Sequence, residues 1–456
     1  MTANKGTSRV GSIVLAQPVD AVFALSAYPL AKMAFVVGIA EGFCFVPSKP
    51  QAVLTPWGAI LLLFVKKERM VSEKLDLIAT AAFGLESQVA YELRQLGYGD
   101  QHVEGGRVTF RGDRSAIART NLWLRVADRV QLRIGEFPAR TFDELFDHVT
   151  ALNWSDWLPE DANFPVDGKS VKSTLTSVPA VQGVVKKAIA QCMARAYGRA
   201  ISPETGAEYR VQVALLNDVA TLTLDTTGDG LHKRGYRTGN AAAPLKETLA
   251  AGLISLSRWR PEWPFADPLC GSGTLPIEAA LQGLNRAPGI KRAFAAEQWR
   301  TLERRVWDQA RQEARDTAIQ ESSLSIWASD LSPQMVEMAR YHARAAGVEK
   351  FIRFGQMAVA AWRTEHPGGV LITNPPYGER LGDRETVEAL YAELGQACQR
   401  LDGWSWHIIT AYPTFEKAFG PPAHKKRKLF NGRLRCDLYH YLAQRAKPEP
   451  GTSRAK

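Results

Sequence analysis

The chain has 456 residues, of which 45% are hydrophobic and 23% charged. This composition excludes a disordered or fibrous protein and is enough for two or three domains with separate cores. Lysine and arginine exceed the acidic residues by ten, and the pI is about 9.3, a balance that suits a protein contacting a polyanion but is also found on solvated basic surfaces. The cysteines are scattered without CxxC or metal-ligand spacing, which favours reduced thiols in a cytoplasmic protein and no bound metal. They are Cys44, Cys192, Cys270, Cys398 and Cys436.

Residues 1–69 are apolar and interrupted by proline and glycine. The apolar run 52–65 is shorter than the roughly 20 residues that cross a membrane, and Lys32 and Glu41 interrupt the stretch before it. We therefore predict neither a membrane span nor a signal peptide, and treat the segment as an appendage of uncertain origin. A domain-like pattern follows Met70 at once, so our hypothesis is that translation naturally begins there, which mass spectrometry of the native N-terminus would test.

Two small α+β units are predicted next. The first contains a strand at 75–81, a helix at 85–96, a strand at 107–111, a helix at 115–126 and an alternating strand at 130–134. The second contains helices at 141–153 and 178–197 and strands at 209–216 and 220–225. Thr141 and Glu144 form a capping-box pattern, and Asn217-Asp218 is a typical hairpin turn. Residues 228–243, rich in glycine, alanine and basic residues, are the predicted linker.

Beyond Pro244 strands alternate with helices, which predicts a doubly wound parallel sheet. The expected strands are 265–266, 325–328, 352–354, 369–373 and 406–410, followed by a hairpin of 427–430 and 436–443. Residues 446–456 are predicted to be a frayed tail.

A glycine-containing loop, DPLCGSGT from Asp267 to Thr274, follows the first strand of this sheet. At this position a loop can lie against a nucleotide-like ligand, and Gly271 and Gly273 allow backbone amides to approach it. The loop lacks the lysine of a P-loop and the third glycine of a dinucleotide fingerprint, whereas Asp267 offers a carboxylate to an ammonium group. The pattern favours S-adenosylmethionine over NAD or ATP; a tight strand-to-helix turn is the alternative.

Asp330 follows the second strand of the sheet, with Ser332 and Pro333 at the start of the next helix. A carboxylate at this position can accept hydrogen bonds from the ribose hydroxyls of a nucleoside. Capping of the helix is the alternative, because Asp and Ser are both common N-caps. The sequence is compatible with both roles.

The segment NPPY, from Asn374 to Tyr377, directly follows an apolar strand. Its two prolines fix the backbone, so the amide oxygen of Asn374 and a main-chain carbonyl are held rigidly at the end of the strand. Such acceptors can orient an exocyclic amino group toward a methyl donor, while the Tyr377 ring can stack on an extruded base. A proline-rich turn is the alternative, but the position after a buried strand favours function.

These motifs carry a family resemblance. DPLCGSGT, SDLSP and NPPYGERLGD, with LHKRGYR at 231–237 and APLKETLAAGL at 243–253, resemble the bacterial THUMP-domain class I methyltransferases that make N2-methylguanine in 23S ribosomal RNA. The resemblance covers about 75–443. It implies a ferredoxin-like domain at 70–140, a THUMP RNA-binding domain at 141–227 and a Rossmann-like methyltransferase domain at 228–445.

The resemblance also implies roles for single residues. S-adenosylmethionine would be bound by the glycine loop and the acid after the second strand, namely Asp267, Gly271, Gly273, Thr274 and Asp330. The target amine would be held by Asn374, Pro375 and Tyr377. The implied partner is RNA, with 23S rRNA as the expected substrate.

Two features depart from the common pattern. The interval 282–321 is long for a bare sheet of this class and is expected to hold an inserted, largely helical segment. Many methyltransferases place an aspartate after the third strand to hold adenine, but GQMA at 355–358 has none. The amide oxygen of Gln356 could accept the adenine amino group instead, with Met357 packing on the ring.

Basic residues lie before the catalytic domain, interleaved with Tyr236, and along the final hairpin. Those predicted to hold RNA phosphates are Lys233, Arg234, Arg237, Lys425 and Lys426. A solvated charged loop is the alternative for the hairpin cluster. Glu379 and Arg380 are expected to brace the NPPY loop through ion pairs.

The motifs predict methylation of an exocyclic base nitrogen in RNA by direct displacement, and the family resemblance implies that the base is a guanine in 23S rRNA. Methylation of tRNA guanine or of adenine is an alternative, because the acceptor pair recognises an amino group and does not identify the base. A non-catalytic RNA-binding or assembly factor is a second alternative, although the intact glycine loop and NPPY motif speak against it.

Overall fold

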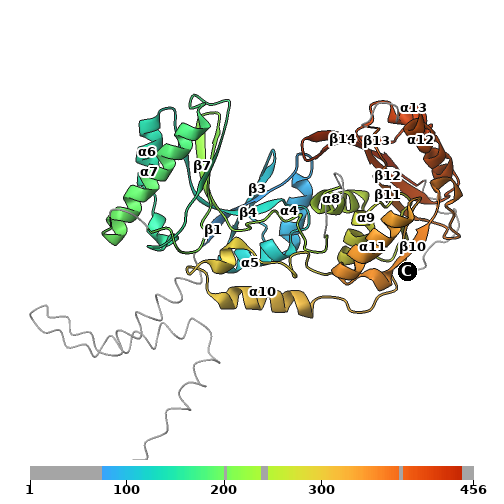
Figure 1. Cartoon of the computed structure of the whole chain (residues 1–456), viewed down its shortest axis with the longest axis horizontal. Coiled ribbons are helices and arrows are strands. Elements are labelled where there is room, and N and C mark those ends of the chain that lie inside the picture. Colours follow the sequence, from blue (N-terminus) through green and yellow to red (C-terminus); the bar gives the residue numbers. More distant parts are fainter. Residues whose placement is uncertain (1–73, 200–202, 238–244, 379–383, 444–456) are drawn as a thin grey trace, which may run out of the picture. The chain divides into compact units, whose positions relative to one another are not determined.

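The computed structural model describes residues 74–199, 203–237, 245–378 and 384–443 (Figure 1). The predicted appendage, the predicted tail at 446–456, and the ion pairs predicted for Glu379 and Arg380 lie outside these residues. Part of the predicted linker, 238–243, lies outside them as well. Among the described helices, none is both long and apolar enough to cross a membrane.

The N-terminal part forms one seven-stranded sheet in which the two predicted α+β units are continuous. Strand β4 of the first unit pairs antiparallel with β7 of the second, from Gln131 opposite Asp225 to Pro138 opposite Val219. The strands, in sheet order, are β2 (Gln101–Glu104), β3 (Arg107–Gly112), β1 (Leu75–Thr80), β4 (Arg129–Pro138), β7 (Val219–Asp225), β6 (Val211–Leu216) and β5 (Val166–Val171). The sequence analysis missed β2 and β5, because both are short and largely polar and lack a clear apolar alternation.

Four helices pack against strands of this sheet: α4 (Glu86–Gln95), α5 (Arg114–Trp123), α6 (Phe142–Thr150) and α7 (Val178–Tyr197). The predicted capping box is confirmed at α6, where the Glu144 amide donates to the Thr141 hydroxyl at 3.1 Å. The predicted hairpin between β6 and β7 is also confirmed, since Asn217 and Asp218 have φ values of 50° and 62°. These positive values are what a two-residue type I′ turn requires.

The C-terminal part forms the predicted, mostly parallel sheet, with all predicted strands present. In sheet order they are β10 (Ile352–Gln356), β9 (Ile326–Asp330), β8 (Phe265–Asp267), β11 (Gly369–Thr373), β12 (Trp404–Thr410), β14 (Leu434–Tyr441) and β13 (Lys425–Asn431). Strands β10, β9, β8, β11 and β12 are parallel, and the final hairpin joins antiparallel to β12. The helices are α8 (Glu247–Ser257), α9 (Thr274–Gly283), α11 (Pro333–Ala346), α12 (Arg384–Gln399) and α13 (Phe415–Phe419).

Alternating side chains of the parallel strands enter two different hydrophobic clusters. Val370 and Ile372 of β11 pack in the cluster that includes α8, α9 and α11, whereas Leu371 packs with α12 and α13. Both faces of the sheet are therefore covered by helices, as expected for a buried parallel sheet. The chain order reverses at β8, which lies between β9 and β11, so the carboxyl ends of these three strands meet where open α/β sheets bind ligands.

The long interval between α9 and β9 contains α10 (Arg304–Asp316) and a short 3₁₀ turn (Ala295–Gln298), so the insertion is helical only in part. Helix α10 packs beside α5 of the N-terminal region (Figure 1). There, the Arg119 guanidinium binds both carboxylate oxygens of Glu313 at 2.8 Å. The Trp299 ring stacks on Tyr209, with 4.8 Å between ring centroids. The insertion thus ties the catalytic region to the N-terminal sheet.

Candidate active site

The glycine loop leaves β8 and enters α9 at Thr274. Gly271 and Gly273 both have positive φ, 51° and 85°, which glycine adopts without a steric penalty. A Cβ on Gly273 would lie 2.8 Å from the Cβ of Ala339 on α11, whereas a Cβ on Gly271 would meet nothing within 4 Å. Gly273 therefore allows close packing of the loop on α11, and Gly271 faces open space.

Asp330, the last residue of β9, holds this loop in place. One carboxylate oxygen accepts the Gly271 amide at 2.9 Å, and the other accepts the Ser332 amide at 3.0 Å. The helix α11 is capped by Ser332, whose hydroxyl accepts from the amide of Met335. Ser332 is thus the N-cap of α11, and Asp330 holds the glycine loop through the Gly271 amide.

Asp267 connects the glycine loop to the loop after β11. Its side chain is buried, and one carboxylate oxygen accepts hydrogen bonds from the Thr373 hydroxyl at 2.7 Å and from the Leu269 amide at 3.2 Å. Burial raises the pKa of the Asp267 carboxyl to about 7, and the nearby Asp330 adds to the shift. Since Thr373 directly precedes Asn374, the glycine loop and the NPPY segment lie at the same edge of the sheet.

The first residue of the NPPY segment is oriented by the last. The Tyr377 hydroxyl donates to the Asn374 amide oxygen at 2.5 Å, and both side chains are half-buried. A carbonyl oxygen has two lone pairs, so the Asn374 oxygen keeps one acceptor position while its direction is fixed. Among the hydrogen bonds of the described residues, none involves the carbonyl of Pro375. The Asn374 oxygen is an oriented acceptor at this corner.

A buried tyrosine that the sequence analysis missed supports the same corner. The Tyr391 hydroxyl of α12 donates to the Pro376 carbonyl at 2.7 Å and lies 3.0 Å from the Thr410 hydroxyl at the end of β12. Tyr391 is fully buried. Its signal in the sequence is weak, because an aromatic residue in an amphipathic helix ordinarily indicates core packing.

Known proteins share this architecture. Family models match a ferredoxin-like domain of RlmL at residues 76–131, a THUMP domain at 139–225 and an RMKL-like methyltransferase domain, UPF0020, at 234–440. The chain is 50% identical over 374 residues to "Putative RNA methyltransferase YpsC" of Bacillus subtilis (strain 168), an alignment that covers 82% of this chain and 97% of that protein. The chain belongs to the UPF0020 family of RMKL-like methyltransferases.

Solved structures agree with this membership. A "predicted N6-adenine-specific DNA methylase" from Listeria monocytogenes is 50% identical, with a TM-score of 0.79 over 83% of this chain and 98% of its own. The structure of SMU.472, "a putative methyltransferase complexed with SAH", is 47% identical, with a TM-score of 0.78 over 82% of this chain and 100% of its own. The predicted fold class, a Rossmann-like class I methyltransferase domain preceded by ferredoxin-like and THUMP domains, is confirmed.

In this UPF0020 protein, the end of β10 lies beside Asp330. Gln356 is opposite Asp330 in the strand register, and the Met357 amide donates to the Asp330 carbonyl at 3.0 Å. The Gln356 side-chain nitrogen donates to the Leu331 carbonyl at 3.4 Å. Its amide oxygen is therefore the end that can accept, as the proposed adenine contact requires.

Two of the basic residues predicted to bind RNA are instead engaged with α9. Arg234 is buried and forms an ion pair with buried Glu278 at 3.5 Å, so its predicted contact with phosphate is wrong. Arg237 donates to the Thr274 hydroxyl at 2.5 Å and pairs with Glu247 at 3.2 Å. Arg234 thus braces α9, and Arg237 joins α8 to the start of α9. Such cations are retained where a carboxylate or carbonyl partner compensates their desolvation.

The other three predicted basic residues are exposed. Lys233 forms an exposed ion pair with Asp229 at 2.8 Å, and Lys425 and Lys426 project from β13, where Lys426 also pairs with Glu416. Exposed ion pairs are weak and exchange readily, so these lysines remain available to a phosphate backbone. Within the described part of the chain, no group of three or more potential ligands is placed to bind a metal.

Proposed function

We propose that this protein transfers a methyl group from S-adenosylmethionine to the exocyclic N2 of a guanine in RNA, with 23S rRNA as the substrate. Membership of the UPF0020 family supports the coarser part of this function, methylation of RNA by an S-adenosylmethionine-dependent enzyme. The observation that carries the proposal is the Asp267–Thr373 hydrogen bond, which joins the glycine loop to the NPPY segment. A donor on one loop and an amine on the other would lie within reach of each other.

The residues around the glycine loop fit S-adenosylmethionine. Gly271 leaves open space where a side chain would stand. Each oxygen of Asp330 accepts one main-chain amide, which leaves further lone pairs for ribose hydroxyls. Asp267 would receive the ammonium, Gly273 and Thr274 would shape the turn, and Gln356 would meet the adenine amino group.

The pKa of Asp267 predicts how donor binding depends on pH. An ammonium beside the carboxyl favours its charged form, but burial raises the pKa of the free protein's carboxyl to about 7. Below that pH the Asp267 carboxyl must therefore release its proton when the donor binds. Donor affinity should then fall by up to about tenfold for each unit by which the pH decreases. Above it, affinity should be level. Calorimetry between about pH 5.5 and pH 7.5 measures this.

Asp267→Asn provides the control, because the amide cannot titrate and should make donor affinity independent of pH over the same interval. An equally flat profile for the unaltered protein would contradict the role of Asp267 as the ammonium's partner.

At the amine site, Asn374 and Pro375 would accept the two hydrogens of the amino group and aim its lone pair at the methyl carbon. The donor supplies an electrophilic methyl group on a sulfonium, so attack needs no strong base and the nitrogen loses its proton afterwards. The Asn374 oxygen is already oriented by Tyr377, which reduces the cost of ordering it. The Tyr377 ring would also lie against the extruded base.

Mapping of modified nucleosides tests the substrate. RNA from a strain lacking the protein, separated into 23S rRNA and tRNA fractions, is compared with RNA from the complemented strain. The expected result is the loss of one N2-methylguanine from 23S rRNA. Loss from tRNA, or loss of N6-methyladenine, would replace the proposed substrate. Binding of labelled S-adenosylmethionine without transfer to any RNA would favour an assembly factor.

A further inference from the structure

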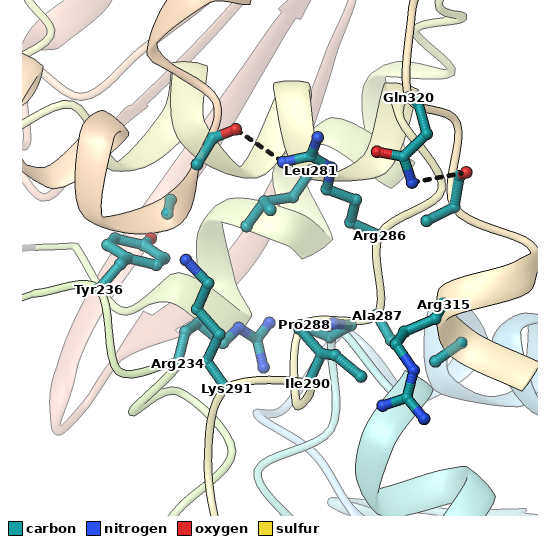
Figure 2. Close-up of a pocket in the computed structure, with 14 residues that line it drawn as sticks. Arg234, Tyr236, Leu281, Arg286, Ala287, Pro288, Ile290, Lys291, Arg315 and Gln320 are labelled. Carbon is teal, nitrogen blue, oxygen red and sulfur yellow. Dashed lines mark hydrogen bonds between the residues drawn. The ribbon is translucent and has the colours of Figure 1, made fainter. Parts of the chain in front are cut away.

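A cavity away from the glycine loop lies between the insertion and the far ends of α9 and α11 (Figure 2). We call it the insertion pocket; its volume is about 330 Å³. Its apolar wall includes Leu281, Pro288, Ala314 and Ala346. Leu281 lies near the last turn of α9, whereas the glycine loop enters the first turn. At 1.5 Å per residue, about 10 Å of helix separates Leu281 from that end.

Four cationic side chains line the same pocket: Arg234, which is paired with Glu278, and Arg286, Lys291 and Arg315, which have no acidic partner among the described residues. Arg286 donates to the Gly347 carbonyl at 2.7 Å, and Lys291 donates to the Ala345 carbonyl at 2.6 Å. Arg315 donates to the Gln312 side-chain oxygen at 2.7 Å. All of these acceptors are uncharged, so the hydrogen bonds direct the cations without neutralising them. No acidic residue is among the described residues that line the pocket.

An apolar wall bordered by uncompensated positive charge selects a particular kind of ligand. Its flat, weakly polar part would lie on the wall, and its anionic part would contact the cations. A nucleotide has both parts, and unpaired RNA presents them together because its bases are free to leave the stack. The volume is at the lower end of the roughly 300–1,000 Å³ typical of small-molecule sites, which suits a single nucleotide.

We propose that the insertion pocket receives one unpaired nucleotide of the RNA strand at a position away from the methylated base. The base would lie on Leu281 and Pro288, and the phosphate would contact Arg286, Lys291 and Arg315. This inference rests on RNA being the substrate of the proposed function. It assigns to the insertion a contact with RNA in addition to the contacts expected of the N-terminal domains.

The pocket is also connected to the catalytic loop. Arg234 and Tyr236 line it, and Tyr236 donates to Glu278 in the middle of α9. Arg237, one residue further, binds the hydroxyl of Thr274. The segment 234–237 therefore runs along α9 from the pocket to the glycine loop, so RNA held in the pocket is positioned relative to the methyl donor.

Arg315→Gln and Ala318→Phe test the pocket by different means. The first removes an exposed charge that hydrogen-bonds, within the described part of the chain, to a glutamine on the same helix, and the second places a ring in the pocket. The matched control is Arg304→Gln, which removes the same charge from the other end of α10. Binding of a labelled single-stranded RNA of randomised sequence is measured at several salt concentrations, with calorimetry of S-adenosylmethionine as a check of folding.

Arg315→Gln should weaken RNA binding about 3- to 10-fold and lower the salt dependence by roughly one phosphate contact. Ala318→Phe should weaken it by about tenfold, because one stacked base is lost. The control should change it less than about twofold. Photocrosslinking with thiouridine-containing RNA should label peptides from 286–291 or 314–318. Unchanged RNA affinity in both pocket variants would overturn the proposal.

Free GMP is the second probe, because the same chemistry suits a soluble nucleotide. In one outcome, GMP binds the unaltered protein but neither pocket variant, while the RNA affinity of both variants is unchanged. That result would assign the pocket to a free nucleotide and contradict the proposed RNA contact. The binding and crosslinking assays do not require methyl transfer. A failure of the proposed function, with RNA still crosslinked in the pocket, would therefore be recognised separately.

Discussion

Asn374→Ala should reduce methyl transfer by about 10³-fold or more while donor affinity stays within about twofold of the unaltered protein. The amide oxygen is the side-chain acceptor aimed by Tyr377 at the end of β11. Without it, the amine of the base can still approach the end of β11 but loses its orientation. Single-turnover transfer to RNA isolated from a strain lacking the protein, with donor binding by calorimetry, measures both quantities.

Tyr377→Phe is the matched variant. It keeps the aromatic ring and the Asn374 oxygen but removes the hydroxyl that directs that oxygen. Turnover should therefore fall by less than in Asn374→Ala, by roughly 10-fold, which corresponds to the loss of one hydrogen bond. Turnover at the unaltered level in Asn374→Ala would refute the role of this residue.

Gly273→Ala should weaken donor binding by about 100-fold. The new Cβ would lie 2.8 Å from the Cβ of Ala339 and 3.2 Å from its Cα, and the residue would have to keep a φ of 85°. The conformation alone costs about 1–3 kcal/mol, and relief of the clash would displace the glycine loop from α11. Isothermal calorimetry with S-adenosylmethionine measures the loss, and thermal unfolding shows whether the fold is retained.

The double variant Gly273→Ala with Ala339→Gly separates the two causes. Removal of the Ala339 methyl relieves the closest contact but not the positive φ, so donor affinity should recover in part. No recovery would mean that the backbone conformation, and not the packing on α11, limits the loop. Unchanged donor affinity in Gly273→Ala itself would remove the glycine loop from the donor site.

Features determined by neighbours in sequence could be predicted before the structure. The capping box of Thr141 and Glu144, the turn at Asn217-Asp218 and the strand before Asn374 all have local signals, and all are confirmed. The proximity of the glycine loop and the NPPY segment also followed from the motifs, because both follow strands of one parallel sheet, whose carboxyl ends lie at the same edge.

Features determined by distant partners could not be predicted in this way. Arg234 has the sequence context of an exposed basic cluster, but Glu278, 44 residues away, draws it into the interior. The contact of Trp299 with Tyr209 depends on how the insertion folds back across the chain. The Asp267–Thr373 hydrogen bond joins residues 106 positions apart. It follows from the pairing of β8 with β11, which brings the ends of these two strands together.

The pairing of β4 with β7 has a consequence for how the N-terminal modules can be separated. A cut near residue 140 would break this ladder and leave each fragment with a bare strand edge, of seven residues on β7 and up to ten on β4. Unprotected edges of this kind attract other chains and promote aggregation. Neither module is therefore expected to be stable when separated from the other. Exchange of one module between homologues would have to preserve the β4–β7 pairing as well as the fold of each module.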